Sequence, residues 1–210
     1  MKYYLGVDQS FTSTGATLLN ENKEIILSTS IPTYPNLLDM HKEYPNQTKK
    51  YLLSLVEIGL LDSEFNLTKK KKDLTKKDKE LLKTDILFRM SIVCDRIDEI
   101  IKSYPENSIA KCGIESISFG SKGNTVDLGM LLGSVIRTVY SNGIEVIKFT
   151  PTEVKKIAGK GNYSKEEMIE AVPQKDLEVI KSNCRINKVG NYLGLDDMVD
   201  SYWICKLAMN

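Results

Sequence analysis

The chain has 210 residues, of which 41% are hydrophobic and 27% charged, and its 29 basic and 28 acidic side chains leave a net charge of +1. This length and composition predict one globular domain with room for an insertion. No apolar run approaches the roughly 18 residues that span a bilayer, and Asp8 interrupts an N-terminal apolar stretch too short for a secretory signal, so we expect a cytoplasmic protein without membrane contact.

The N-terminal part of the chain favours strands, followed by irregular structure. Residues 2–8 alternate and then run apolar up to Asp8, and residues 14–19 and 25–30 indicate two more strands joined by a turn over 20–23. These segments predict an antiparallel meander. Prolines make residues 32–48 loop-like, and residues 62–73 have no regular pattern. Between these two segments a short helix is expected over 48–58.

Helices and strands alternate in the rest of the chain. Apolar residues at steps of three and four predict a long helix over 76–102. Residues 150–153 and 164–167 each have the composition of a capping box, which starts a helix. The other predicted elements are strands over 109–115 and 144–149 and helices over 125–141 and 195–209.

This order of elements predicts an α/β fold. Three leading strands followed by alternating helices and strands indicate a mixed sheet flanked by helices. The lysine-rich segment 35–80 interrupts the pattern and is interpreted as an insertion into a single domain over 1–210.

The near-zero net charge hides two basic segments. Residues 69–83 contain eight lysines and three acids, a local charge of +5, and residues 148–165 contain five lysines and one acid, a charge of +4. The rest of the chain then carries −8. Basic patches on an acidic body indicate a polyanionic partner bound at defined places, although a solvated helix or loop explains the first patch equally well.

Histidine and cysteine chemistry is not favoured. The only histidine, His41, lies among prolines, and the four cysteines contain no C-x-x-C pair, which predicts reduced thiols rather than a zinc site or disulfides. Any hydrolytic chemistry must therefore rest on carboxylates, lysines or metals.

Carboxylates occur where an α/β sheet forms its binding crevice. Asp8 and Glu115 end predicted strands, and Asp197 and Asp200 share one face at the start of the last helix. Converging carboxylates repel one another unless cations neutralise them, and oxygen ligands suit Mg²⁺ or Mn²⁺. Two such ions about 4 Å apart activate a water and stabilise the leaving oxygen of a phosphodiester. We therefore predict metal-assisted phosphodiester hydrolysis.

The order and spacing of several motifs resemble those of the RuvC-type Holliday junction resolvases. The match covers roughly residues 1–30 and 85–210. It rests on LGVDQS at 5–10, TG at 14–15, IE at 114–115, TPTEVK at 150–155, GKG at 159–161 and DMVD at 197–200.

The resemblance implies a fold, an activity and a set of site residues. These are an RNase H-like fold with a mixed five-stranded sheet, a homodimer, and Mg²⁺-dependent paired nicking of four-way DNA junctions. The family's metal-binding, catalytic carboxylates fall on Asp8, Glu115, Asp197 and Asp200. Its DNA-approaching lysines fall on Lys155 and Lys165, and Lys160, Phe119 and Lys122 complete the expected DNA-binding set.

The chain also departs from the family pattern. Gln9 and Ser10 stand where a Pro-Gly pair is common, and the position of the family's aromatic falls on Ser118, with Phe119 beside it. With its lysine-rich insertion, the chain resembles the phage-encoded members of the family more than the cellular ones. Asp196 is an alternative to Asp197 as a metal ligand, because it lies four residues before Asp200.

Three other functions fit parts of the sequence. Residues 8–15 also resemble the phosphate loop of actin-like ATPases and sugar kinases, but 210 residues leave no room for the second core that those proteins need. A non-catalytic protein that binds DNA structures would not need the carboxylates. A general nuclease for forks and other branched DNA would use the same site as a junction resolvase, and the sequence does not separate these two.

Overall fold

The computed structural model describes residues 1–59, 75–117 and 125–210. The chain divides into two compact units, one comprising Met1–Pro32 and Val93–Asn210 and the other Thr33–Ile92. The predicted insertion at 35–80 falls within the second unit, and the assignment of the whole chain to a single domain stays a prediction. A membrane-crossing helix is not found within the described ranges.

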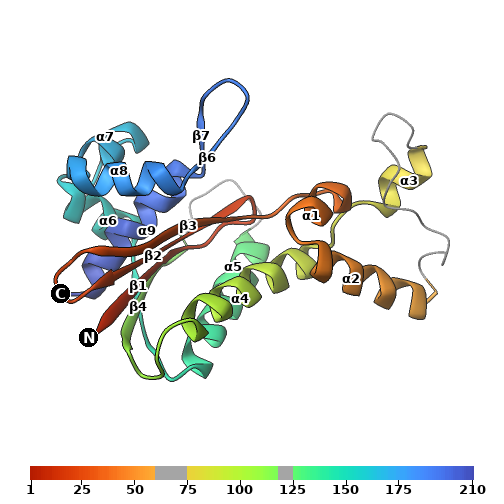
Figure 1. Ribbon diagram of the computed structural model, residues 1–210, viewed down its shortest axis with the longest axis horizontal. Coiled ribbons are helices and arrows are strands. Elements are labelled where there is room, and N and C mark those ends of the chain that lie inside the picture. The colour runs from red at the N-terminus through yellow and green to blue at the C-terminus, as the bar shows by residue number, and fades with distance from the viewer. Residues whose placement is uncertain (60–74, 118–124) are drawn as a thin grey trace. The chain divides into compact units, whose positions relative to one another are not determined.

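The first unit contains a five-stranded sheet with the order β3-β2-β1-β4-β5 (Figure 1). β1, β2 and β3 pair antiparallel, whereas β4 and β5 continue from β1 in parallel. This confirms the predicted mixed sheet. The strands are Tyr3–Asp8 (β1), Ser13–Asn20 (β2), Ile25–Pro32 (β3), Ile109–Glu115 (β4) and Glu145–Phe149 (β5).

Helices cover both faces of this sheet (Figure 1). α9 packs directly on β1, β2 and β4, and α6, α7 and α8 pack around α9. α5 and the part of α4 that starts at Val93 lie on the opposite face. The helices are Ile86–Lys102 (α4), Thr125–Ser141 (α5), Pro151–Ala158 (α6), Lys165–Glu170 (α7), Gln174–Asn183 (α8) and Leu195–Ala208 (α9).

Glycines in the strands let the backbone of α9 lie directly against the sheet. A Cβ atom at Gly6 of β1 would lie 2.1 Å from the carbonyl oxygen of Ser201, and one at Gly15 of β2 would lie 1.9 Å from that of Asp197. Gly113 of β4 makes a third close contact with the same helix. Because no larger residue fits at these distances, the glycines fix where α9 sits.

A buried polar network joins α9 to β2 and β3. The hydroxyl of Thr17 lies 2.8 Å from that of Ser201 and 3.1 Å from that of Ser28, and Ser201 donates to the carbonyl oxygen of Met198. All three hydroxyl residues are buried. Since each buried hydroxyl has a partner, the network fixes the rotation of α9 without leaving a costly unpaired polar group.

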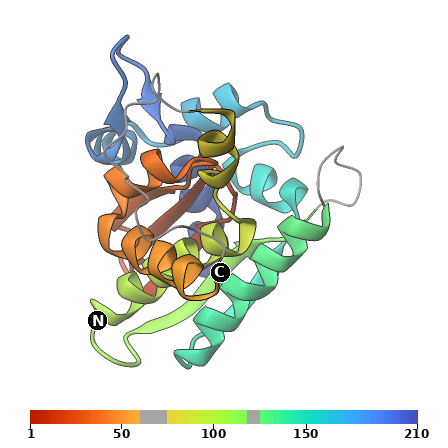
Figure 2. The same ribbon diagram turned by 90° about the vertical axis from the view of Figure 1, so that its right-hand side faces the viewer.

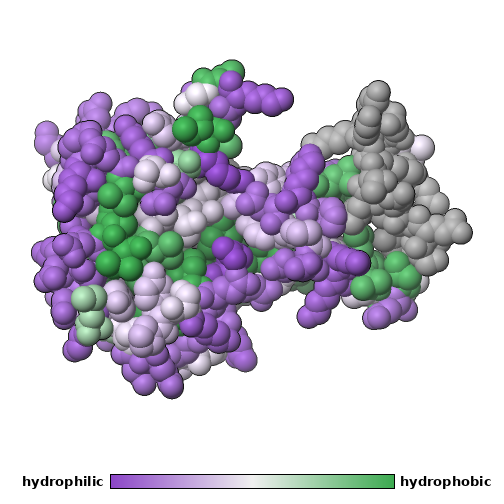
Figure 3. Space-filling model, in the orientation of Figure 1, coloured by the Kyte–Doolittle hydropathy of each residue, from purple (hydrophilic) through white to green (hydrophobic). Residues whose placement is uncertain are grey.

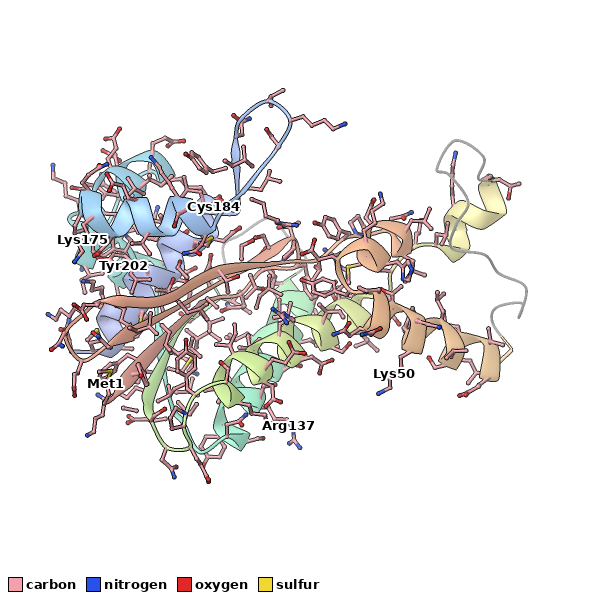
Figure 4. The ribbon with its side chains drawn as sticks, viewed as in Figure 1. Met1, Lys50, Arg137, Lys175, Cys184 and Tyr202 are labelled. Carbon is pink, nitrogen blue, oxygen red and sulfur yellow. The ribbon has the colours of Figure 1, made fainter. Side chains whose placement is uncertain are left out.

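The outer side of α9 is held by α7 and α8. The hydroxyl of Tyr202, labelled in Figure 4, donates to a carboxylate oxygen of Asp176 on α8 over 2.6 Å. The Trp203 indole donates to the carbonyl oxygen of Met168 on α7 over 3.2 Å. α9 is therefore buried on most of its circumference, and its acidic N-terminal end lies at the edge of the core, as the sequence predicts.

The second unit has a small core of its own. Its helices are Leu37–Glu43 (α1), Pro45–Glu57 (α2) and Lys76–Leu81 (α3), together with the start of α4. Leu37, Met40 and Leu82 are fully buried in this core, and Tyr51 stacks on Phe88 with ring centroids 4.2 Å apart.

Two sequence predictions in this unit are wrong. Residues 32–48 form α1 and the start of α2 rather than a loop, because Asn36 caps α1 and Pro45 occupies the first turn of α2, where no N–H donor is needed. The predicted single helix over 76–102 is two helices. The break occurs where Leu82 and Thr84 pair with the backbone near Pro35, a long-range contact that periodicity does not show.

Two elements of the first unit were not predicted. They are α8 and a hairpin of two short strands, Arg185–Ile186 (β6) and Tyr192–Leu193 (β7). Strands of two residues are too short to show an alternation of apolar and polar residues, so the sequence does not predict them. The two predicted capping boxes at Thr150 and Ser164 are confirmed, and all four cysteines are free thiols.

The close contact between α9 and the strand glycines can be tested by measuring the stability of the folded protein. We expect Gly15→Ala to lower the free energy of unfolding by about 3 kcal/mol or more, because its Cβ would displace the backbone of α9. Gly129→Ala is the matched control, since its Cβ would meet only Ile117 at 3.9 Å, and it should raise helix stability by up to about 1 kcal/mol. Urea unfolding measures both, and an unchanged midpoint for Gly15→Ala would contradict the packing described.

Candidate active site

Two of the predicted acids end neighbouring parallel strands. Val7 of β1 is in register with Ile114 of β4, so the next residues, Asp8 and Glu115, end these strands side by side. The Gln9 side-chain amide donates to the backbone oxygen of Glu115 over 2.8 Å. This hydrogen bond ties the two strand ends together.

The other two acids come from the start of α9. Asp8 is paired in register with Gly15, the glycine against which the backbone of Asp197 lies. The Asp197 carboxylate accepts a hydrogen bond from the hydroxyl of Ser13. Asp200 lies one turn further on the same helix face. The glycine seat thus brings the acidic turn of α9 to the ends of β1 and β4.

Burial and mutual repulsion raise the pKa values of these carboxyl groups. Burial, and then the charges of Asp200, Glu115 and Asp197, raise the pKa of Asp8 well above its ordinary value. Burial and repulsion also raise the pKa of Glu115 to about 7, and burial raises that of Asp200 to about 6. The pKa of Asp197 is raised by burial as well. The four groups therefore share one electrostatic environment.

Asp196 differs from its neighbour Asp197. Its carboxylate forms an ion pair with the ammonium group of Lys165 on α7. Burial raises the pKa of Asp196, but the hydrogen bond and charge of Lys165 outweigh it, so the net shift is downward. Asp196 is thus paired with a protein cation, although its charge still raises the pKa of Asp197 and Asp200. Asp197, in addition, raises the pKa of Asp8.

The predicted lysines divide into two groups. The charge of Lys165 lowers the pKa of Asp8, Glu115 and Asp200, and that of Lys155 on α6 lowers the pKa of the last two. Lys160 lies exposed between α6 and α7, and no effect of its charge on these carboxyl groups is found. Phe119 and Lys122 lie outside the described residues, as do Lys69–Lys72.

The donor set fits a divalent cation. Asp8, Glu115, Asp197 and Asp200 supply only oxygen ligands, and Lys155 and Lys165 offset only part of their charge. The raised pKa values show that the metal-free site resists full ionisation, a cost that a bound cation would remove. In the described part of the chain no group of three such side chains is gathered tightly enough to hold an ion.

Sequence reasoning missed two side chains that support the acids. Ser13 donates to Asp197, and Gln9, which the sequence marks only as a departure from the family, bonds to Glu115. The side-chain oxygen of Gln9, Oε1, is buried and has no hydrogen-bond partner. The available signal was their position, since Gln9 directly follows Asp8 and Ser13 begins the next strand.

Comparisons with known proteins bear on the family and the fold. A family model described as "Crossover junction endodeoxyribonuclease RuvC" matches residues 69–188. The structure of Thermus thermophilus RuvC aligns with 97% of this chain and 90% of its own at a TM-score of 0.55 and 15% identity. T. thermophilus RuvC in complex with a Holliday junction substrate aligns with 98% of this chain and 90% of its own, at a TM-score of 0.56 and 15% identity. No curated protein sequence matches. At this identity the structural likeness shows the fold alone, and it confirms the RNase H-like architecture.

The raised pKa of Glu115 generates a prediction about the metal-free protein. Between its ordinary pKa of 4.5 and about 7 the folded group holds a proton that the unfolded chain has lost, so stability falls as pH rises through this window. We expect Glu115→Gln to raise the free energy of unfolding by about 2–3 kcal/mol at pH 8 and far less at pH 5. Urea titrations in the presence of a chelator measure this.

The exposed strand residue Glu145 provides the control for that experiment. Glu145→Gln should change stability little at either pH. A gain for Glu115→Gln of the same size at pH 5 and pH 8 would contradict the assignment of its pKa.

Proposed function

The chain belongs to the RuvC family of crossover junction endodeoxyribonucleases, whose model matches more than half of it, and we propose that it resolves four-way DNA junctions by metal-dependent, paired phosphodiester hydrolysis. The observation that carries this proposal is the electrostatic coupling of Asp8 to three further carboxylates at one edge of the sheet. A set of buried, mutually repelling acids is costly to the fold, which supports a functional reason for it.

The four carboxylates would hold the metal, with Mg²⁺ as the expected ion, two ions as the expected number, and Mn²⁺ as a substitute. The chemistry that bound Mg²⁺ supplies is activation of a water and stabilisation of the leaving oxygen. Gln9 fixes the ends of β1 and β4, so Asp8 and Glu115 keep their spacing. Ser13 orients the carboxylate of Asp197.

The lysines are proposed to receive the DNA backbone. Lys165 is held at the site by its ion pair with Asp196, so its charge faces the place where a phosphate would approach the carboxylates. Lys155 adds a second positive charge near Glu115 and Asp200. Lys160, Phe119 and Lys122 remain predicted DNA contacts, and a phage origin remains a prediction from the lysine-rich insertion.

We also propose that the enzyme acts as a homodimer, because two symmetric nicks need two symmetric sites. Helix α5 supports this proposal. Leu131, Val135 and Val139 are buried, while the other face exposes Met130 and Tyr140. Gly129 and Gly133 are exposed on that face and meet little or nothing where a side chain would stand, so a second helix could approach closely.

The carboxylates give the first functional test. Asp200→Asn removes one charge from the metal ligands, so junction nicking with Mg²⁺ should fall about 100-fold or more. The fold should persist and binding should be equal or tighter, because phosphates meet less repulsion. Gel assays of nicking and binding on a four-way junction measure both effects.

Asp196→Asn and Asp197→Asn form a matched pair for that test. Loss of nicking is expected for Asp197→Asn, with a much smaller effect for Asp196→Asn, since Asp196 is engaged by Lys165. The reverse result would move the metal ligand to Asp196. Nicking that survives every carboxylate change would refute the proposed mechanism, and equal cleavage of a junction and a three-way fork would favour the general branched-DNA nuclease.

The dimer is tested on α5. Wild-type protein should sediment at about twice its 23.7 kDa mass, and Met130→Glu combined with Tyr140→Glu should yield a monomer, because two charges would be buried in the apolar contact. Val179→Glu, a change of an exposed apolar residue on α8, is the control and should leave the mass unchanged. A wild-type monomer at micromolar concentration, with and without DNA, would contradict the proposal.

A further inference from the structure

The β6–β7 hairpin has no role in the chemistry described above. It connects α8 to α9 and projects away from the rest of the first unit in two perpendicular views (Figures 1 and 2). Arg185 pairs with Leu193 and Ile186 with Tyr192. The family model that matches the chain ends at residue 188, within this hairpin.

The hairpin exposes apolar side chains. Val189 at its tip is 79% exposed, and the opposed pair Ile186 and Tyr192 are 61% and 41% exposed. Hydrophobic and hydrophilic residues appear together on this projection in Figure 3. Several exposed apolar residues on one small element are typical of an interaction site rather than of a solvent-facing turn.

The tip is ordered by its own hydrogen bonds. The side-chain oxygen of Asn187 accepts the backbone N–H groups of Val189 and Asn191 at 3.0 and 2.9 Å. Gly190 has a φ of +88°, which a side chain would disfavour. The backbone at Lys188 and Val189 is therefore ordered within the turn, so a partner would meet less loss of backbone conformational entropy.

The charge of this segment indicates the kind of partner. Between Glu178 and Asp196 the chain has no acidic residue, and its cations are Lys181, Arg185 and Lys188. The ammonium group of Lys181 lies 5.7 Å from the ring centroid of Tyr192. Positive charge interleaved with an aromatic ring and aliphatic side chains is complementary to nucleic acid, which offers phosphates beside stacked bases.

Both ends of the hairpin are joined to the carboxylate site. At one end, the thiol of Cys184, labelled in Figure 4, lies 3.6 Å from the sulfur of Met198 on α9. At the other end, Gly194 precedes α9 and lies against the hydroxyls of Ser13 and Ser30. The base of the hairpin therefore lies next to the first turn of α9, which carries Asp197.

We propose that the hairpin is a wedge that places Ile186, Val189 and Tyr192 against unpaired bases at the branch point, while Lys188 contacts the adjacent phosphate. The proposal rests on the proposed function only in taking branched DNA as the ligand. Apolar side chains stabilise unstacked base steps, and an aromatic ring stacks on any base. A wedge of this kind distinguishes a branch from a continuous duplex, since only the branch offers bases without full stacking.

The test uses the full-length protein and a four-way junction with 2-aminopurine at the branch point. Ca²⁺ replaces Mg²⁺ so that binding proceeds with little turnover. Wild-type protein should raise 2-aminopurine fluorescence. Ile186→Ser and Val189→Ser should each abolish most of that rise and weaken junction binding about tenfold, with less than a twofold change on a linear duplex.

Two further variants separate the contribution of the apolar hairpin side chains from that of the Lys188 charge. Ile26→Ser on β3 removes an equally aliphatic, 41% exposed side chain away from the hairpin and should behave as wild type. Lys188→Ser should weaken binding to all DNA and reduce the slope of log affinity against log salt by about 0.9. Thermal unfolding of each variant checks that the fold is intact.

The outcomes distinguish the hairpin proposal from the proposed function. If the wild type nicks junctions in Mg²⁺ but the hairpin variants match it in fluorescence and affinity, the hairpin proposal is overturned and the function stands. If the wild type does not nick but the variants lose junction affinity, the function fails and the hairpin proposal holds. A wild type that binds no branched DNA overturns both, and the exposed apolar residues then serve a protein partner.

Discussion

The contact between the backbone of α9 and the strands beneath it determines the geometry of the whole site. Three glycines on adjacent strands remove the side chains that normally separate a helix from a sheet. The buried hydroxyl network around Thr17 then sets the rotation of the helix. Because α9 carries Asp197 and Asp200, these packing constraints place two carboxylates against the strand ends that carry the other two. Precision at the site thus derives from regular elements rather than from loops.

Bringing the four carboxyl groups together costs electrostatic free energy in the folded state. Carboxyl groups that are partly buried together hold protons at a pH where exposed ones are ionised, as the raised pKa of Glu115 shows. Lys165 relieves part of the repulsion but is itself shared with Asp196. The remaining negative charge is what the proposed cation would neutralise. Stability and function are therefore opposed at this edge of the sheet, and the rest of the core must compensate.

The sequence predicts most of the strands and helices of the first unit well, because the patterns that indicate them lie within short segments of the chain. Strand patterns and capping boxes predict the five strands, α6 and α7. Acids at two strand ends, and acids followed by apolar residues at the start of α9, predict the candidate site and the last helix. The signals that failed depend on distant partners. The break between α3 and α4 follows from pairing with residues near Pro35, and the strands of the hairpin are too short to show a pattern. Gly6 and Gly15 stand inside strands, which indicates close backbone approach, but nothing local identifies α9 as the helix that approaches.

The packing of α9 on the sheet also determines when the site can form during protein synthesis. The thiol of Cys205 on α9 donates to the carbonyl oxygen of Tyr4 on β1, across 201 residues of sequence. A ribosome-bound chain that has reached Glu115 already contains Asp8, yet it lacks the helix that covers this face of the sheet and brings the remaining acids. Contacts of such long sequence separation form late and slowly. A nascent chain therefore cannot assemble the four-carboxylate site before α9 emerges, so incomplete chains lack two of the four carboxylates proposed to bind the metal.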